Sequence, residues 1–94
     1  MPTILITGAS GGLAQELVKL LPDDQLILLG RDKEKLAQIY GNHTHAELIE
    51  IDITDDSALE SLVTDLYLRY GEIDVLINNA GYGIFEEFDQ ISDQ

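Results

Sequence analysis

Four short apolar runs, separated by stretches with helical periodicity, constrain the fold of this chain more than any other feature of its sequence. The runs are rich in isoleucine and leucine and lie at Thr3–Thr7, Leu26–Leu29, Glu47–Ile51 and Ile73–Ile77. Runs of this kind indicate strands buried within a sheet. Because a helical segment separates each run from the next, the strands should form a parallel sheet with right-handed crossovers. We therefore predict a doubly wound α/β fold with a βαβαβαβ pattern and the strand order 3-2-1-4.

The three segments between these runs carry the signals that begin and end helices. Asp32 is suited to cap the second helix, and Gly41 to end it. Thr54 or Asp55 is the expected N-cap of the third helix, and Gly71 is its expected end. Apolar residues recur at helical spacing in the first helix at Leu13, Leu17, Val18, Leu20 and Leu21, in the second at Leu36, Ile39 and Tyr40, and in the third at Leu59, Leu62, Val63, Leu66 and Tyr70.

The balance of charge limits the partners that this chain can bind. Its 18 acidic residues outnumber its 5 basic residues, so the formal net charge is −13. Such a field repels nucleic acids and anionic membrane surfaces, and neither is an expected partner. A small molecule that carries phosphate can still bind through backbone N–H groups or a well-placed cation.

The chain contains no cysteine, which excludes disulfides, thiolate metal sites and thiol nucleophiles. It shows no signal peptide and no apolar run near the ~20 residues that a membrane-spanning helix needs. With a length of 94 residues, these features predict one cytoplasmic domain over residues 1–94. His43 and His45 have a metal-like spacing but no third ligand nearby, so we interpret them as loop residues.

A glycine-rich turn follows the first predicted strand and reads TGASGGLA over residues 7–14. Gly8 can adopt the tight backbone that leaves a buried strand. Gly12 has no side chain, so a pyrophosphate can approach the main chain, and Ala14 is small enough for close packing of the helix on the sheet. Free N–H groups and the helix dipole favour a phosphate anion at this point.

The spacing of this turn resembles Thr-Gly-x-x-x-Gly-x-Gly, the cofactor motif of the short-chain dehydrogenase/reductase family, with Ala14 in place of the third glycine. Three further segments resemble that family, each at the end of a predicted strand. Asp52 and Ile53 match its adenine-contacting position, and the NNAG sequence at residues 78–81 matches its signature. Gly30 and Arg31 stand where the family selects between cofactors.

The resemblance implies a Rossmann-type dinucleotide-binding domain and corresponds to the first half or less of a usual family member. Gly11 stands where many members have Ser or Arg, which removes one phosphate contact. The cofactor-binding residues that the resemblance implies are Gly8, Ser10, Gly11, Gly12, Leu13, Arg31, Asp52, Ile53, Asn79, Ala80 and Gly81.

The charge at the end of the second strand favours NADP over NAD. A carboxylate there would bind the ribose hydroxyls of NAD, but Leu29 and Gly30 leave the place without an acid. The guanidinium of Arg31 suits a 2′-phosphate. Asp32 has two possible roles, because it either caps the following helix or points at the ribose, and the second role would favour NAD.

Family resemblance implies catalysis by a Tyr-x-x-x-Lys pair with a Ser and an Asn, in which the tyrosine is the general acid or base. No tyrosine in this chain has a lysine four residues later, since the residues at that spacing from Tyr40, Tyr67, Tyr70 and Tyr82 are Thr44, Gly71, Asp74 and Glu86. In the family, these catalytic groups lie further along the chain. We therefore expect no catalytic residue in these 94 residues and no reduction by them alone.

Three functions remain open on the sequence. The chain is the front part of an NADP-dependent oxidoreductase, a dinucleotide-binding module without catalysis, or a module that pairs with other chains. The third follows from the edge of the fourth strand, because unpaired N–H and C=O groups promote pairing. We expect a homo-oligomer, formed through that edge or through the C-terminal half that usual family members have.

Overall fold

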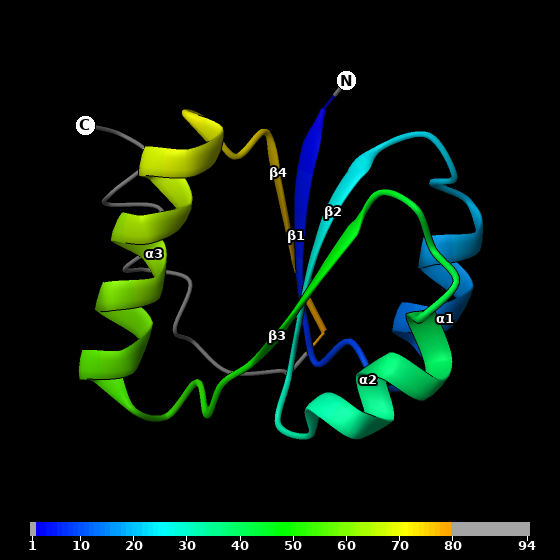
Figure 1. Cartoon of the computed structure of the whole chain (residues 1–94), viewed down its shortest axis with the longest axis horizontal. Helices are drawn as coiled ribbons and strands as arrows, with labels where there is room; N and C mark the ends of the chain where they lie inside the picture. Colours follow the sequence, from blue (N-terminus) through cyan, green and yellow to red (C-terminus); the bar gives the residue numbers. More distant parts are fainter. Residues whose placement is uncertain (1, 80–94) are drawn as a thin grey trace.

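A parallel β-sheet forms the centre of the structure, a computed structural model that describes residues 2–79 (Figure 1). Within those residues the sheet has four strands in the order β3-β2-β1-β4, as the sequence predicts. The elements in chain order are β1 (Thr3–Thr7), α1 (Gly12–Lys19), β2 (Gln25–Gly30), α2 (Lys33–Tyr40), β3 (Ala46–Glu50), α3 (Asp56–Tyr70) and β4 (Val75–Asn78).

The pairing register brings the carboxyl ends of the strands to one edge of the sheet. Thr7, the last residue of β1, lies beside Asn78, the last residue of β4. On the other side of β1, Ile6 lies beside Leu28 of β2. Because every pair is parallel, the segments that follow β1, β2, β3 and β4 all begin at this edge. Ligands of open α/β sheets bind at such an edge.

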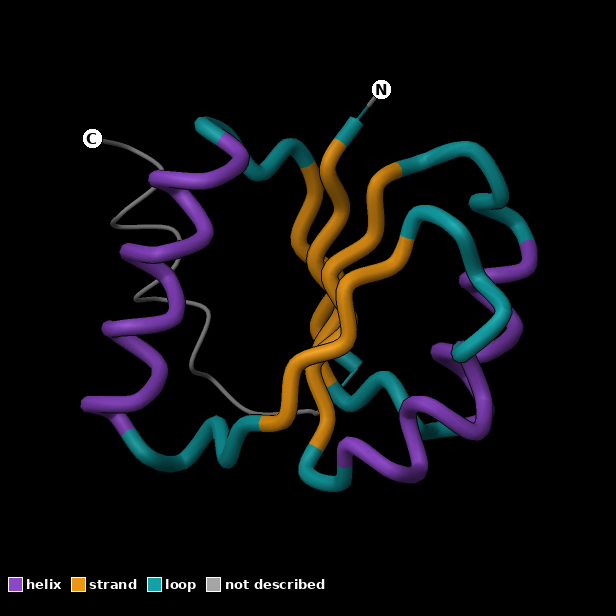
Figure 2. The backbone as a smooth tube through the Cα atoms, viewed as in Figure 1, coloured by secondary structure: helices purple, strands orange, loops and turns teal. Residues whose placement is uncertain are grey.

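Helices cover both faces of the sheet (Figure 2). Side chains of a strand alternate between the faces, so Ile4 and Ile6 of β1 pack in the layer of α1 and α2, while Leu5 packs against α3. The most deeply buried large side chains are Leu5, Ile6, Leu26, Ile27, Leu28, Leu29, Leu36, Leu59 and Leu66. The apolar runs in the first two strands are thus explained by burial on two sides.

Two of the apolar residues that recur at helical spacing near α1 are exposed. Leu13 is 65% exposed and Leu20 is 75% exposed, whereas Ala14 and Val18 are buried. The helix has only 8 residues, about two turns, so it can bury few side chains. Leu20 is the C-cap beyond the last turn, and Leu13 is the second residue of the helix, at the carboxyl edge of the sheet.

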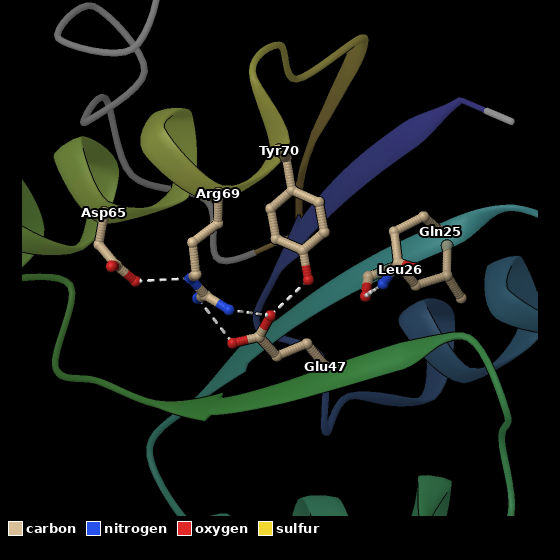
Figure 3. A network of polar contacts seen from close by, with 6 residues as sticks. All are labelled: Gln25, Leu26, Glu47, Asp65, Arg69 and Tyr70. Atoms are coloured by element: carbon tan, nitrogen blue, oxygen red, sulfur yellow. Dashed lines mark hydrogen bonds and ion pairs between the residues drawn. The ribbon is translucent and has the colours of Figure 1, made fainter.

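A network of polar side chains ties α3 to the edge strand β3 (Figure 3). The Glu47 carboxylate accepts hydrogen bonds from Arg69 Nη1 at 2.8 Å and Arg69 Nη2 at 2.7 Å, and from the Tyr70 hydroxyl. Arg69 Nε also donates to Asp65 at 2.9 Å. The bonds from Arg69 are the main reason that the pKa of Glu47 lies below its ordinary value. The network anchors the end of α3 over the outer part of the sheet.

Candidate functional site

The turn after β1 is a tight one that only glycine accommodates easily. Gly8 has a φ of 61°, in the region that other residues seldom adopt. The Gly11 N–H donates to the Gly8 carbonyl at 3.1 Å and closes the turn. The Ala9 N–H donates to the Leu29 carbonyl of β2 at 2.9 Å, which ties the turn to the neighbouring strand.

The amino end of α1 carries no capping side chain. Its N-cap is Gly11, and no acidic residue lies in its first turn. By contrast, the side chains of Asp32 and Asp55 accept hydrogen bonds from the first turns of α2 and α3. A Cβ built on Gly12 would meet no atom within 4 Å, so the space in front of this helix end is open. An uncapped, unobstructed helix end attracts anions.

Two side chains from distant parts of the sequence hold the turn by hydrogen bonds to its backbone carbonyl groups. The Tyr40 hydroxyl, at the end of α2, donates to the Ala9 carbonyl at 2.5 Å. Asn79 Nδ2, just after β4, donates to the Gly8 carbonyl at 3.0 Å. Tyr40 is only 6% exposed, and burial raises the pKa of its hydroxyl. The hydroxyl therefore stays protonated and remains a donor at neutral pH.

A cavity of about 360 Å³ opens beside the turn, at the carboxyl ends of β1, β2 and β3. Its lining combines the apolar residues Ile51 and Ile53 with charged residues. The lining residues are Gly8, Ser10, Gly30, Arg31, Asp32, Lys35, Ile51, Asp52, Ile53 and Thr54.

Asp52 is a fixed hydrogen-bond acceptor in this cavity. Its Oδ1 accepts from Thr54 Oγ1 at 2.6 Å and from Thr54 N at 3.0 Å. These bonds, and to a lesser degree the charge of Arg31, lower the pKa of Asp52. Arg31 Nη2 lies 3.9 Å from Asp52 Oδ2, and both side chains are at least half exposed, so this ion pair is weak.

Asp32 caps α2, which is the first of the two roles that the sequence leaves open. Its Oδ1 accepts from Glu34 N at 3.0 Å and from Lys35 N at 3.3 Å. The side chain is thus engaged with its own helix. At the third helix, the N-cap is Asp55 rather than Thr54, whose hydroxyl is bound to Asp52.

The structure gathers most of the sequence-predicted site residues into one region. Gly8, Ser10, Arg31, Asp52 and Ile53 line the cavity. The adjoining start of α1 contains three more of them, Gly11, Gly12 and Leu13. Asn79 contacts the turn through its side-chain amide. Ala80 and Gly81 lie outside the described residues.

Four residues near the site were not predicted from the sequence to belong to it. Lys35, Ile51 and Thr54 line the cavity, and Tyr40 braces the turn. A tyrosine on the inner face of a helix signals a need for a hydrogen-bond partner, but its spacing does not identify that partner. Lys35 stands four residues after Arg31 and lies on the first turn of a helix that begins at the sheet edge. That position could have suggested it.

Metal ligands do not gather anywhere in residues 2–79, where no group of three His, Cys, Asp or Glu side chains could hold an ion. His43 Nδ1 accepts a hydrogen bond from the backbone N–H of His45 at 3.2 Å. In the same part of the chain, no helix is both long and apolar enough to cross a membrane.

Comparison with known proteins gives consistent matches. The profile of the short chain dehydrogenase family matches residues 2–94. An uncharacterized oxidoreductase of Schizosaccharomyces pombe is 36% identical over 89 residues, which cover 93% of this chain and 30% of that protein.

Solved structures agree with this. A metagenomic short-chain oxidoreductase in complex with NADP is 31% identical with a TM-score of 0.74, over 87% of this chain and 40% of that one. A short-chain dehydrogenase from Streptomyces avermitilis is 32% identical with a TM-score of 0.71, over 83% of this chain and 30% of that one. The chain therefore spans well under half the length of these relatives.

Proposed function

The chain belongs to the short-chain dehydrogenase family, and on that premise we propose that it forms the dinucleotide-binding portion of an NADP-dependent oxidoreductase. In the whole enzyme, a hydride would pass between the nicotinamide ring and a carbonyl or alcohol carbon. The observation that carries the proposal is the uncapped end of α1, which faces open space at Gly12. Such a helix end is suited to a pyrophosphate.

The cavity beside the turn suits the adenosine half of the cofactor. Ile51 and Ile53 offer apolar contact to a flat base, and Asp52 offers an acceptor for its exocyclic amino group. Because Thr54 holds the Asp52 carboxylate by two hydrogen bonds, the acceptor is oriented before a ligand arrives. Pre-orientation lowers the entropic cost of binding.

Packing supports the choice of NADP over NAD. A Cβ on Gly30 would lie 3.0–3.1 Å from side-chain carbons of Leu36, so an acid at this position would force the core residue to move. Asp32 is bound to the backbone of α2. Arg31 remains highly exposed and only weakly paired, and its guanidinium can receive a 2′-phosphate. The metagenomic relative at 31% identity binds NADP.

Thermal unfolding with and without cofactor tests the proposal. At about 100 times its Kd, NADPH should stabilise the chain by about 2.7 kcal/mol, which for a domain of this size raises Tm by roughly 10 °C or more. NADH at the same concentration should raise Tm less. An unchanged Tm with saturating NADPH would exclude dinucleotide binding by this chain.

The Gly12→Val variant tests whether the pyrophosphate binds at this end of α1. A side chain at this position meets no protein atom within 4 Å of its Cβ, so the variant should fold with nearly unchanged stability. The same side chain would occupy the approach of the pyrophosphate. We expect the NADPH-dependent rise in Tm to disappear in Gly12→Val. A rise equal to that of the wild type would place the phosphates elsewhere.

Binding without turnover is the expected behaviour of these 94 residues on their own. None of the four tyrosines has a lysine four residues later, which is the spacing of the family's acid–base pair. Oxidation of NADPH with a panel of carbonyl compounds, followed by absorbance, should therefore remain at the background rate. Turnover above background would show that other residues can act as the acid or base.

A further inference from the structure

The first N–H groups of α2 are already occupied by carboxylates. Lys33 N donates to Glu50 Oε1 at 2.9 Å, from the end of β3. Glu34 N and Lys35 N both donate to Asp32 Oδ1, at 3.0 and 3.3 Å. This helix start therefore differs from that of α1, where no side chain caps the N–H groups. An anion beside the end of β2 finds no free backbone donor among these three.

Side-chain cations can supply the charge that holds a phosphate in this part of the cavity. Among the described residues that line it, the cations are Arg31 and Lys35. Arg31 comes from the loop directly after β2, and Lys35 comes from the first turn of α2. The weak pair with Asp52, at 3.9 Å, accounts for part of the charge of Arg31. Within residues 2–79, no ion pair involves Lys35.

Lys33 and Lys35 both lie in the first turn of α2, where the helix dipole disfavours positive charge, but only Lys35 lines the cavity. The two cations of the cavity, Arg31 and Lys35, also match the charge of a phosphate monoester, which carries up to two negative charges near neutral pH.

We propose that Lys35 is a second specificity-determining residue, which binds the 2′-phosphate of NADP together with Arg31. The assignment rests on the proposed cofactor function and deepens it. The planar guanidinium would hold the phosphate through two donors, and the ammonium would add a second positive charge. Since Glu50 and Asp32 already accept from the N–H groups of Lys33, Glu34 and Lys35, these three donors do not replace the Lys35 ammonium when it is removed.

Calorimetric titration of the chain with NADPH and with NADH tests the assignment in wild type, Lys35→Gln and Lys33→Gln. Lys33 is the matched control, because it is exposed, carries the same charge and lies on the same helix turn, but does not line the cavity. Lys35→Gln should bind NADPH about tenfold more weakly and NADH within twofold of wild type. Lys33→Gln should bind both within twofold of wild type.

The possible results separate this inference from the proposed function. Equal losses for NADPH and NADH in Lys35→Gln, or no loss at all, would overturn the role of Lys35 while leaving cofactor binding intact. Equal losses of NADPH affinity in Lys35→Gln and Lys33→Gln would mean that only the net charge of the chain matters, and this would also overturn the role of Lys35. If the wild-type chain binds neither cofactor, both the proposed function and this assignment fail. Melting temperatures of the two variants near that of wild type confirm that folding is unchanged.

Discussion

At the scale of single residues, a buried hydroxyl group is one of the two side-chain supports of the glycine-rich turn after β1. The Tyr40 hydroxyl donates to the carbonyl of Ala9, a residue with no exposed surface. A buried carbonyl that loses its partner costs more than the mean value of a hydrogen bond, because it has also lost its water. The side chain that supports the turn lies 31 residues away in sequence.

Tyr40→Phe should therefore lower the free energy of unfolding by about 1–3 kcal/mol. It should also weaken NADPH binding, since the turn loses a support. Urea denaturation measures the first effect and titration the second. Tyr40→Leu, which removes the ring as well, should cost more and so separates packing from the hydrogen bond. Unchanged stability in Tyr40→Phe would contradict the role of the hydroxyl.

Gly30 is a second position where a single atom matters. Gly30→Ala should destabilise the chain by about 1–3 kcal/mol, because its Cβ would lie 3.0–3.1 Å from Leu36 in a packed core. Gly12→Ala is the control, since its Cβ meets no atom within 4 Å. Thermal or urea unfolding of the two variants measures the difference. Equal changes in the free energy of unfolding of the two variants would mean that the Leu36 side chain can move aside without destabilising the core.

Sequence reasoning succeeded for residues whose role is local and did less well for residues whose partners are distant. The cap at Asp32 follows from its place before a helix. The partner of Tyr40 depends instead on how α2 and the turn after β1 meet in space, which no spacing within α2 reveals. Lys35 presents the same difficulty, because the cavity that it lines is built from three separate segments of the chain.

At the scale of elements, the position of α3 over β3 depends on an ion pair as well as on apolar packing. Glu47 lies in the edge strand, where its side chain is 28% exposed, and Arg69 binds both of its oxygens. Arg69 also contacts the ring of Tyr70, with its guanidinium carbon 5.4 Å from the ring centroid. Burial, followed by the bond to Glu47, raises the pKa of Tyr70 to about 12.

This network predicts a specific dependence of stability on pH. In the folded chain, the hydrogen bonds from Arg69 lower the pKa of Glu47 below its ordinary value of 4.5. The folded state therefore binds fewer protons at Glu47 than the unfolded state does. The stabilisation is complete above about pH 4.5 and is lost as the pH falls through the folded pKa. Glu47→Gln should cost about 1 kcal/mol at pH 7 and progressively less below pH 4.5.

Urea denaturation at several pH values measures this effect. Glu60→Gln is the control, because Glu60 is an exposed residue of α3 outside the network. We expect its stability to follow the wild type at every pH. A constant difference between Glu47→Gln and wild type, from neutral to acidic pH, would mean that the ionisation of Glu47 does not stabilise the fold.

The existence and order of the elements could be predicted, while their ends were less certain. The first strand has the predicted bounds, but the fourth begins at Val75 rather than Ile73. The reason is that Asp74 precedes the ladder, where its side chain and backbone bond to Thr3 of β1. Tertiary contacts of this kind decide strand ends, and hydrophobic periodicity does not record them.

At the scale of the whole molecule, β4 lies at the edge of the sheet. Within residues 2–79 it pairs with β1 and no other strand, and Val75 is 43% exposed. Edge strands with apolar side chains promote pairing between chains. We expect the 94-residue chain to self-associate, as the sequence also suggests.

Sedimentation velocity over a range of concentrations measures this self-association. Val75→Lys should shift the chain toward the monomer, because a charged side chain at an edge strand opposes strand pairing. Leu68→Lys is the control, since Leu68 lies on α3 and is 81% exposed. A monomeric wild type at high concentration, or equal effects of the two lysine substitutions, would contradict pairing through β4.

The bracing of the turn by Asn79 also bears on the order in which the protein is made. The turn begins at Gly8, but the amide that supports it follows 71 residues later in the chain and therefore leaves the ribosome after it. A nascent chain thus presents the glycine turn long before it can hold the turn in place. Cofactor binding should begin only after β4 has joined the sheet, so NADPH could serve as a probe of how far co-translational folding has advanced.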